Sequence, residues 1–151
     1  MAGFSTYLET KIMQWMVKRQ QLPTPPTTVQ ISLHSLDPGD TGANELASSG
    51  AYARVTMTTD TDDTAPNAVN WNVTAADGTA WAFTNKLPIT FPQATADWFS
   101  GNPITFAGIW DAGGTNFLAT CSITPSGVVV LNGNTLSFTG GTPGQLKFKV
   151  D

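Results

Sequence analysis

Cysteine and histidine are almost absent from the sequence, which contains one of each in 151 residues. The single cysteine, Cys121, excludes an internal disulfide bond and a multi-cysteine metal site. The single histidine, His34, cannot supply the several imidazoles of the usual zinc site. Because Cys121 falls at an apolar position of a predicted strand, we interpret it as a small buried hydrophobe and not as a nucleophile. We therefore expect no metal ion and no cofactor.

Charged side chains are also scarce: they make up 12% of the residues, and their formal sum is −4 at pH 7. The seven lysines and arginines are scattered along the chain and form no basic stripe that could neutralise phosphates. We therefore expect no nucleic-acid partner. The low charge has two interpretations: partner subunits cover much of the surface, or the surface is the weakly charged one of many extracellular β-sandwiches.

Long hydrophobic runs are missing as well. No apolar stretch approaches the length of about 20 residues that a membrane-spanning helix needs, so we expect no membrane partner. The N-terminus lacks the basic start, apolar run and small-residue cleavage site of a signal peptide. We expect the chain to be made and folded in a cytoplasm.

Combinations of side chains that could support catalysis are hard to find. His34 precedes Asp37 and Asp40, but the nearby serines show no nucleophile-elbow pattern. We interpret His34 as a surface or loop-anchoring residue and expect no catalytic residues. Asp97 has Arg54 as a candidate ion-pair partner, and we favour a structural role in which the Asp97 carboxylate accepts backbone amides.

The acidic segment Asp60–Asp63 alternates oxygen ligands of the kind that calcium prefers. It lacks the glycine and the terminal glutamate of a known calcium loop. We favour a solvated loop at this position, with weak ion binding as the alternative.

Turn-forming residues are abundant by contrast, with 14 glycines and 10 prolines. They separate short stretches in which apolar and polar residues alternate, the pattern of half-buried strands. We expect strands at 29–34, 52–58, 69–73, 81–83, 89–91, 104–110, 117–123 and 146–150, and a further apolar run at 128–131 that continues to 138. This count of about eight to nine strands, with no second helix, predicts an all-β fold: a β-sandwich with jelly-roll-like crossing.

One helix is predicted before the strands, over residues 5–19. Thr6 and Glu9 have the spacing of a capping box. Four apolar side chains recur at helical spacing and form one face of the helix. They are Leu8, Ile12, Trp15 and Met16, and Met13 widens this face. A helix of this length is marginal in water by itself, so we expect another surface to cover this face.

A proline-rich stretch joins the helix to the strands and must be extended or polyproline-like. We therefore divide the chain into an N-terminal helical arm (1–22), a linker (23–28) and a β-sandwich domain (29–151). The helix either folds back to cap the sandwich or docks on another subunit. We favour docking, because the stretch 20–28 spans about 25 Å at the polyproline rise and suits a neighbour better than a fold-back.

The most apolar run in the chain is 104–110, which we expect to be buried on both faces. Five residues are assigned to the densest part of the core: Phe91, Phe106, Ile109, Phe117 and Leu118. Strict alternation leaves either Phe117 or Leu118 facing outward. Replacing Phe106 with alanine is expected to cost about 3–5 kcal/mol.

Five tryptophans raise the hypothesis of sugar binding, because aromatic faces stack on sugar rings. Trp15 belongs to the helix, whereas Trp71, Trp81, Trp98 and Trp110 fall in apolar strands or in the central segment. A carbohydrate platform needs two or three of them exposed on one surface. We favour core packing.

Four motifs follow one another in a fixed order along the chain: LHSLDPGDTG at 33–42, SGAYAR at 49–54, FPQATADW at 91–98 and FAGIWDAGG at 106–114. Their order and spacing resemble those of a family of small bacteriophage virion proteins that are described as tail-fibre-like. The resemblance covers the chain from about residue 29 to the C-terminus. The link at 99–103 departs from the family pattern, in which a tighter glycine-containing connection is expected.

This resemblance implies a non-enzymatic structural protein of the virion, made in the host cytoplasm. The implied partners are further copies of the chain, in a homotrimer, and other virion proteins, either the major capsid protein or tail proteins. We expect the arm to attach the β-domain through Leu8, Ile12, Trp15 and Met16. The protein is then an external decoration or cement protein of the capsid, or a tail-fibre-like subunit. The alternative is a host-glycan-binding module of the tail apparatus.

Overall fold

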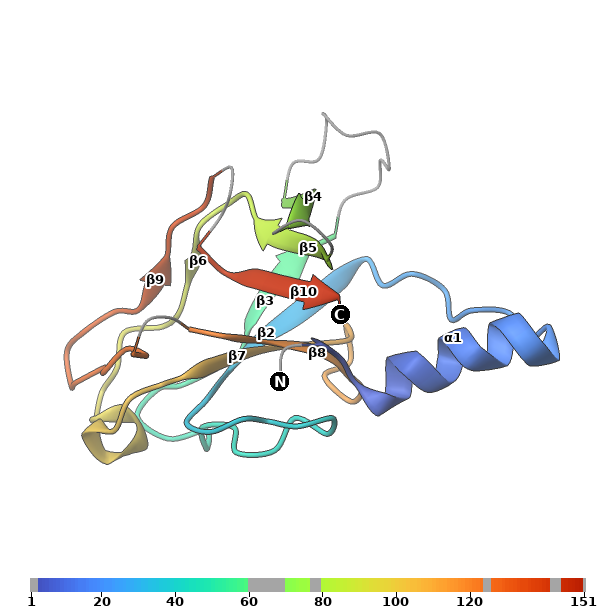
Figure 1. Ribbon diagram of the computed structural model, residues 1–151. Coiled ribbons are helices and arrows are strands. Elements are labelled where there is room, and N and C mark those ends of the chain that lie inside the picture. The colour runs from blue at the N-terminus through green and yellow to red at the C-terminus, as the bar shows by residue number, and fades with distance from the viewer. Residues whose placement is uncertain (1–2, 60–69, 77–79, 124–125, 142–144, 151) are drawn as a thin grey trace.

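The computed structural model describes residues 3–59, 70–76, 80–123, 126–141 and 145–150, and Figure 1 shows their arrangement. Within these residues the chain forms one α-helix, α1 (Thr6–Lys18), one short 3-10 helix, η1 (Trp98–Gly101), and ten strands. The strands are β1 (Gly3–Phe4), β2 (Thr28–His34), β3 (Val55–Thr58), β4 (Trp71–Ala76), β5 (Ala80–Asn85), β6 (Ile89–Thr90), β7 (Phe106–Trp110), β8 (Phe117–Ser122), β9 (Ser137–Phe138) and β10 (Lys147–Val150). The expected all-β fold with an N-terminal helix is confirmed.

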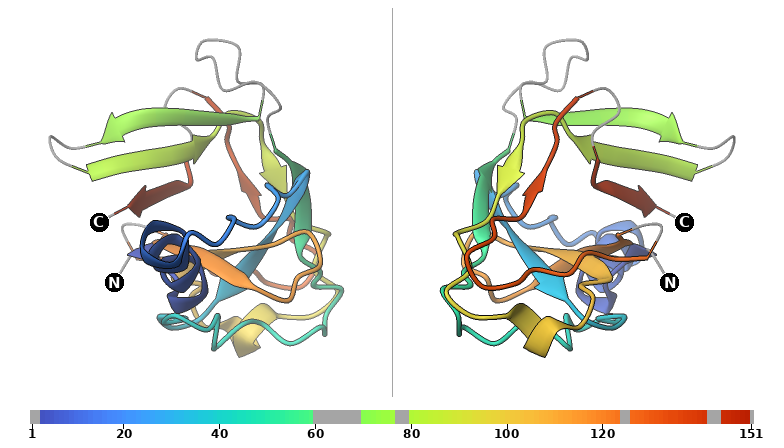
Figure 2. Two further views of the ribbon diagram at one scale, coloured as in Figure 1. Left: turned by 90° about the vertical axis from the view of Figure 1, so that its right-hand side faces the viewer. Right: turned by 90° about the vertical axis from the view of Figure 1, so that its left-hand side faces the viewer.

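The strands form three antiparallel sheets. The largest has five strands in the order β1-β8-β7-β2-β3, the second has three in the order β10-β5-β4, and β6 pairs with β9. Figure 2 shows the three-stranded sheet stacked over the five-stranded one, with β10 the nearest of its strands. The jelly-roll-like crossing of these strands stays a prediction.

The core lies between these sheets and is closed at one end by the β6–β9 pair. In the register of β2 and β7, Ile31 pairs with Ile109 and Leu33 with Ala107, and all four side chains are buried. Further along, Phe91 packs its ring against Trp98 and Phe138. Each large side chain buried in this way contributes about 1.5–3 kcal/mol to folding.

Phe106 does not belong to this core, so that sequence prediction is wrong. Phe106 pairs with His34 and lies on the opposite face of the sheet from Leu33 and Ile31, where it is only half-buried. Its truncation should therefore cost less than the expected 3–5 kcal/mol. Phe91, at 1% exposure, has the environment for which a cost of about 3–5 kcal/mol is appropriate.

The second face of the five-stranded sheet is also covered, by the loop 35–51 that runs below β2 and β7 in Figure 1. Phe117 lies on this face, buried against the rings of Trp110 and His34. Leu118 is half-buried on the core side, because the register of β7 and β8 shifts between Ile109 and Trp110. The prediction that either Phe117 or Leu118 faces outward is therefore wrong, because neither side chain is fully exposed.

Several strand boundaries differ from those expected. The strand expected at 52–58 begins only at Val55, and the apolar run 128–131 makes a single bridge, between Val128 and Ile104, with no strand. Strand β1 was not expected at all; its two residues pair with Ala119 and Thr120 of β8. The acidic segment 60–63 lies outside the described residues.

The link 99–103 also has an unusual backbone. Phe99, Ser100 and Gly101 all have positive φ angles, of 48°, 55° and 78°. A left-handed turn therefore stands where the resemblance implied a tighter glycine-containing link, and two of its three residues carry side chains that disfavour this conformation.

Candidate functional site

The N-terminal arm is fixed to the β-domain where helix α1 begins. The N-cap is Ser5, whose Oγ accepts a hydrogen bond from the Leu8 amide at 3.4 Å, so the expected capping role of Thr6 is wrong. Ser5 is buried, its hydroxyl donates to the carbonyl of Phe117, and its amide donates to the carbonyl of Leu118 at 2.9 Å. Thr6 instead donates its hydroxyl to the Asp40 carboxylate at 3.1 Å. The start of the helix is thus held by β8 and by the loop 35–51.

Beyond this anchor, α1 projects away from the sheets (Figure 1). None of its 13 residues is buried. The helix ends at Lys18, and its C-cap Arg19 adopts the left-handed conformation. The chain then returns beside the helix as an extended proline-containing segment toward β2 (Figure 1). The arm therefore consists of a helix and an extended segment that run side by side, and it makes little contact with the sheets.

The four residues expected to form the attachment face behave as two pairs. Leu8 and Ile12 are half-buried and line a groove of about 550 Å³ between the helix and the segment 22–26. Trp15 and Met16 are exposed, at 53% and 63%. Only the outer half of the expected face is therefore free for contact with another molecule.

Two further apolar side chains of the outer half are also exposed, Met13 at 55% and Val17 at 68%. At 100° per residue, each lies about 160° around the helix axis from Trp15. Val17 lies outside the single apolar face that helical spacing predicted. The signal that identifies it is the run 15–17, three consecutive apolar residues in a helix.

A second apolar hollow, of about 300 Å³, lies at the base of the arm between the five-stranded and three-stranded sheets. Phe4, Leu8 and Leu118 line both this hollow and the groove beside the linker. Its other walls include Ile109 of β7 and Phe83 of β5. We call it the inter-sheet pocket.

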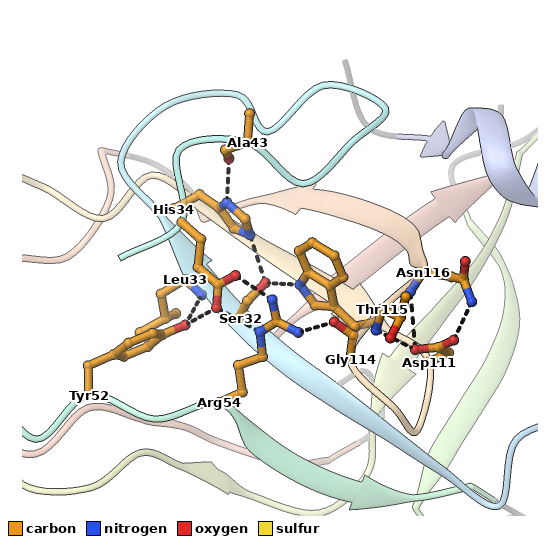
Figure 3. A network of polar contacts seen from close by, with 12 residues as sticks. Ser32, Leu33, His34, Ala43, Tyr52, Arg54, Asp111, Gly114, Thr115 and Asn116 are labelled. Carbon is orange, nitrogen blue, oxygen red and sulfur yellow. Dashed lines mark hydrogen bonds and ion pairs between the residues drawn. The ribbon is translucent and has the colours of Figure 1, made fainter. Parts of the chain in front are cut away.

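The only histidine, His34, is completely buried in a polar network on the outer face of the five-stranded sheet (Figure 3). Its Nδ1 lies 2.7 Å from the carbonyl oxygen of Ala43 and must donate to it, because a carbonyl only accepts. The neutral Nε2 then accepts from the Ser32 hydroxyl at 2.7 Å, and Ser32 in turn accepts from the indole N–H of Trp110 at 2.8 Å. Burial lowers the pKa of His34 and keeps its ring neutral.

This serine–histidine pair has the composition of a nucleophile and its base, but its geometry is that of a structural contact. Ser32 is fully buried and both of its hydrogen-bonding roles are used. The pair is covered by the loop 35–51, with Gly42 packed directly on the ring of Trp110. The network therefore anchors the loop 35–51. Of the two roles expected for His34, a surface residue or a loop anchor, the structure has the loop anchor.

A neighbouring part of the network centres on Arg54 (Figure 3). Its guanidinium binds both carboxylate oxygens of Glu45, at 2.7 and 2.6 Å, and donates to the carbonyl of Gly114 at 2.9 Å. Asp97, the ion-pair partner considered for Arg54, instead accepts the backbone amide of Asn132 at 2.8 Å. Arg54 thus ties the loop 35–51 to the β7–β8 hairpin, while Asp97 has the structural role that the sequence favoured.

The remaining candidate residues are also structural. Cys121 is buried, and burial raises the pKa of its thiol to about 12. Such a thiol is a structural hydrophobic group and not a nucleophile. Trp71, Trp98 and Trp110 are buried, with exposures of 8%, 1% and 8%. The side chain of Trp81 lies outside the described ones, so Trp15 is the one exposed tryptophan among those described.

Together, the fold and its free surface define a small β-structured protein with a projecting N-terminal helix. Among the described residues, no helix is long and apolar enough to span a bilayer. The model of a family described as "Podophage GP4 fiber I protein gp80" matches residues 3–145, and the chain belongs to this family. It is a bacteriophage fibre-type protein, a structural component of the virion that associates with other virion proteins. No curated protein matches the chain.

Proposed function

We propose that this protein is an external, non-enzymatic subunit of the phage tail-fibre apparatus and that its N-terminal arm attaches it to neighbouring virion subunits. One observation carries the proposal: Met13, Trp15, Met16 and Val17 are all exposed in the outer half of α1. A helix that is apolar on several sides is normally a buried helix. We therefore infer that the arm becomes enclosed when the protein joins the particle.

The energetics support the same role. Burying each of these side chains contributes about 1.5–3 kcal/mol, which offsets the cost of ordering the arm at an interface. The arm is also separated from the core, since none of its helical residues is buried and the described hydrogen bonds between the helix base and the β-domain come from Ser5 and Thr6. Contact at the outer half can therefore form without any rearrangement of the sheets.

The family description supports a fibre position over capsid decoration or a cement role. We further propose a homotrimer, because three-fold symmetry is common in phage appendages and the family resemblance points to it. Leu8 and Ile12 support the arm from beneath in this proposal. Trp15 and Met16 reach a neighbouring copy of the chain, and Met13 and Val17 reach other virion proteins. We favour this attachment role over host-glycan binding, because the described tryptophans of the β-domain are buried and present no ring for a sugar to stack on.

The test is incorporation of a Met13→Ser/Val17→Ser double variant into virions, by complementation of phage that lack the wild-type gene. The matched control is Leu36→Ser/Leu87→Ser, which removes two exposed apolar side chains from the β-domain. Both variants should melt like the wild type in isolation. The arm variant should be lost from purified particles and the control retained; an arm variant incorporated at wild-type level would overturn the attachment role.

A further inference from the structure

The inter-sheet pocket at the base of the arm has no described side chain that fills it. Its walls come from four parts of the chain: Phe4 beside the arm, Ile109 and Leu118 in the five-stranded sheet, Phe83 in the three-stranded sheet, and Thr59 after β3. Its accessible lining is almost entirely apolar, and its volume is about 300 Å³. This is space for one large side chain and not for an extended ligand.

Trp15 is the exposed side chain of this molecule that suits such a pocket. It combines a large apolar ring with an N–H that can remain at a wet rim. It cannot enter the pocket of its own chain. Leu8 already lines that pocket, and Trp15 lies seven residues further along the helix, about 10 Å away. The helix runs away from the sheets in this direction (Figure 1).

Charged side chains are distributed unevenly along the arm. Lys18 and Arg19 lie at the outer end of the helix, whereas Glu9, Asp40 and Asp111 lie around its base, the last lining the groove beside the pocket. Residues 1–22 carry three cations and one anion, or +2. The remaining residues carry four cations and ten anions, or −6, which together give the −4 of the whole chain. The tip of one arm is therefore complementary to the base of another and repels a second tip.

We propose that the arm of one copy docks head to tail on a second copy, with Trp15 inserted into the inter-sheet pocket and Lys18 and Arg19 near the acidic base of the second arm. This inference rests on the proposed attachment role of the arm and names one of its partners as the chain itself. If each copy donates its Trp15 to one neighbour and receives that of another, the contact generates a closed ring or an extended filament, and if two copies exchange arms it generates a two-fold dimer. Met13 and Val17, on the far side of the helix, stay available for other virion proteins.

The test uses the purified full-length protein in sedimentation velocity over a concentration series. The wild type should self-associate, and Trp15→Ser should weaken association by about ten-fold or more. Val17→Ser is the matched control: it also removes an exposed apolar side chain from the same helix, about 160° away, and should associate like the wild type. Leu118→Glu, which places a charge at the half-buried rim of the pocket, should abolish association as Trp15→Ser does.

A mixing experiment then tests whether the contact joins Trp15 of one copy to the pocket of another. A Trp15→Ser chain keeps its pocket and a Leu118→Glu chain keeps its tryptophan, so mixing the two should restore a single contact and give a 1:1 heterodimer. An interface in which Trp15 packs on Trp15, or pocket on pocket, would give no complex. If Leu118→Glu does not melt cooperatively, Thr59→Trp serves instead, because it fills the pocket from half-buried Thr59.

A wild type that stays monomeric over the concentration series, equal association of the Trp15→Ser and wild-type proteins, or a mixture without heterodimer would each overturn this inference. The proposed function has its own readout, which is incorporation of the Met13→Ser/Val17→Ser variant into particles. Loss of that variant from virions together with normal association of Trp15→Ser refutes the pocket contact and leaves the attachment role standing. Normal incorporation of the Met13→Ser/Val17→Ser variant refutes the attachment role itself.

Discussion

The guanidinium group of Arg54 lies over the indole ring of Trp110, with its central carbon 3.9 Å from the ring centroid. The same guanidinium forms a forked ion pair with Glu45 and donates to the carbonyl of Gly114. Glu45 is held in place by the Tyr52 hydroxyl, which donates to it at 3.0 Å. This contact therefore joins the loop 35–51, the segment before β3 and the β7–β8 hairpin on the outer face of the sheet.

Replacing Arg54 with lysine should destabilise the protein although the charge is retained. Lysine has no planar fork for the two oxygens of Glu45 and cannot stack on Trp110 while donating to Gly114. The expected loss of unfolding free energy is about 1–3 kcal/mol, measured by urea denaturation. Arg19→Lys, at an exposed position, is the control. Equal midpoints for the two variants would show that the fork and the stacking contribute nothing.

Gly42 should not tolerate a side chain, for two separate reasons. Its φ angle is +74°, and a Cβ at this position would come within 2.3 Å of the Trp110 ring and 2.8 Å of the Phe117 ring. Gly133 has a similar φ of +84° with open space around it, so Gly133→Ala reports the backbone cost alone, about 1–2 kcal/mol. Gly42→Ala should lower the melting temperature clearly more than Gly133→Ala does. Equal shifts would mean that the loop can lift from the sheet at no cost.

Acidification below about pH 6.5 should destabilise the protein through His34. Burial lowers the pKa of His34 in the folded state, so the unfolded chain binds the proton first as the pH falls. The contribution of His34 is complete above the unfolded pKa of about 6.5 and is lost as the pH falls from there through the folded pKa, by at most about 1.4 kcal/mol per pH unit. Denaturation at a series of pH values should show this slope.

The control for this titration is His34→Gln, which keeps a polar side chain at the position without a titrating ring. Its absolute stability should be lower at every pH, because the contacts of His34 with Ser32 and Ala43 are disrupted. Between pH 7 and 5 its stability should change less than that of the wild type. An identical slope in both proteins would assign the acid sensitivity to other groups.

Ser5→Ala should weaken helix α1, whereas Thr6→Ala should have a smaller effect. Ser5 is the buried N-cap and its hydroxyl also donates to β8, while Thr6 makes one exposed contact with Asp40. Loss of an N-cap costs about 1 kcal/mol. Amide hydrogen exchange of residues 8–18 should therefore be faster in Ser5→Ala than in Thr6→Ala. The reverse order would restore Thr6 as the capping residue.

Local sequence patterns predicted much of the fold. Alternation of apolar and polar residues located β2, β8 and β10, a continuous apolar run located β7, and helical spacing located α1, because these patterns reflect which sides of an element leave water. The same reasoning identified the apolar face of the arm. It could not divide that face into a half-buried inner part and an exposed outer part, because this depends on where the linker runs.

Tertiary structure alone decided which polar residues are buried. Ser32 and His34 alternate with apolar residues as solvent-facing side chains do, yet both have no exposed surface, because the loop 35–51 returns over them. Phe106 has the sequence pattern of a core residue, but it pairs with His34 on the outer face of the sheet and is only half-buried. Strand β1, with two residues, has no periodicity to detect and exists because β8 offers it an open edge. The sequence by itself thus determined where most strands and the helix lie. Long-range packing determined which of their faces are exposed to water, because the residues that a distant segment covers keep the same apolar–polar pattern as exposed ones.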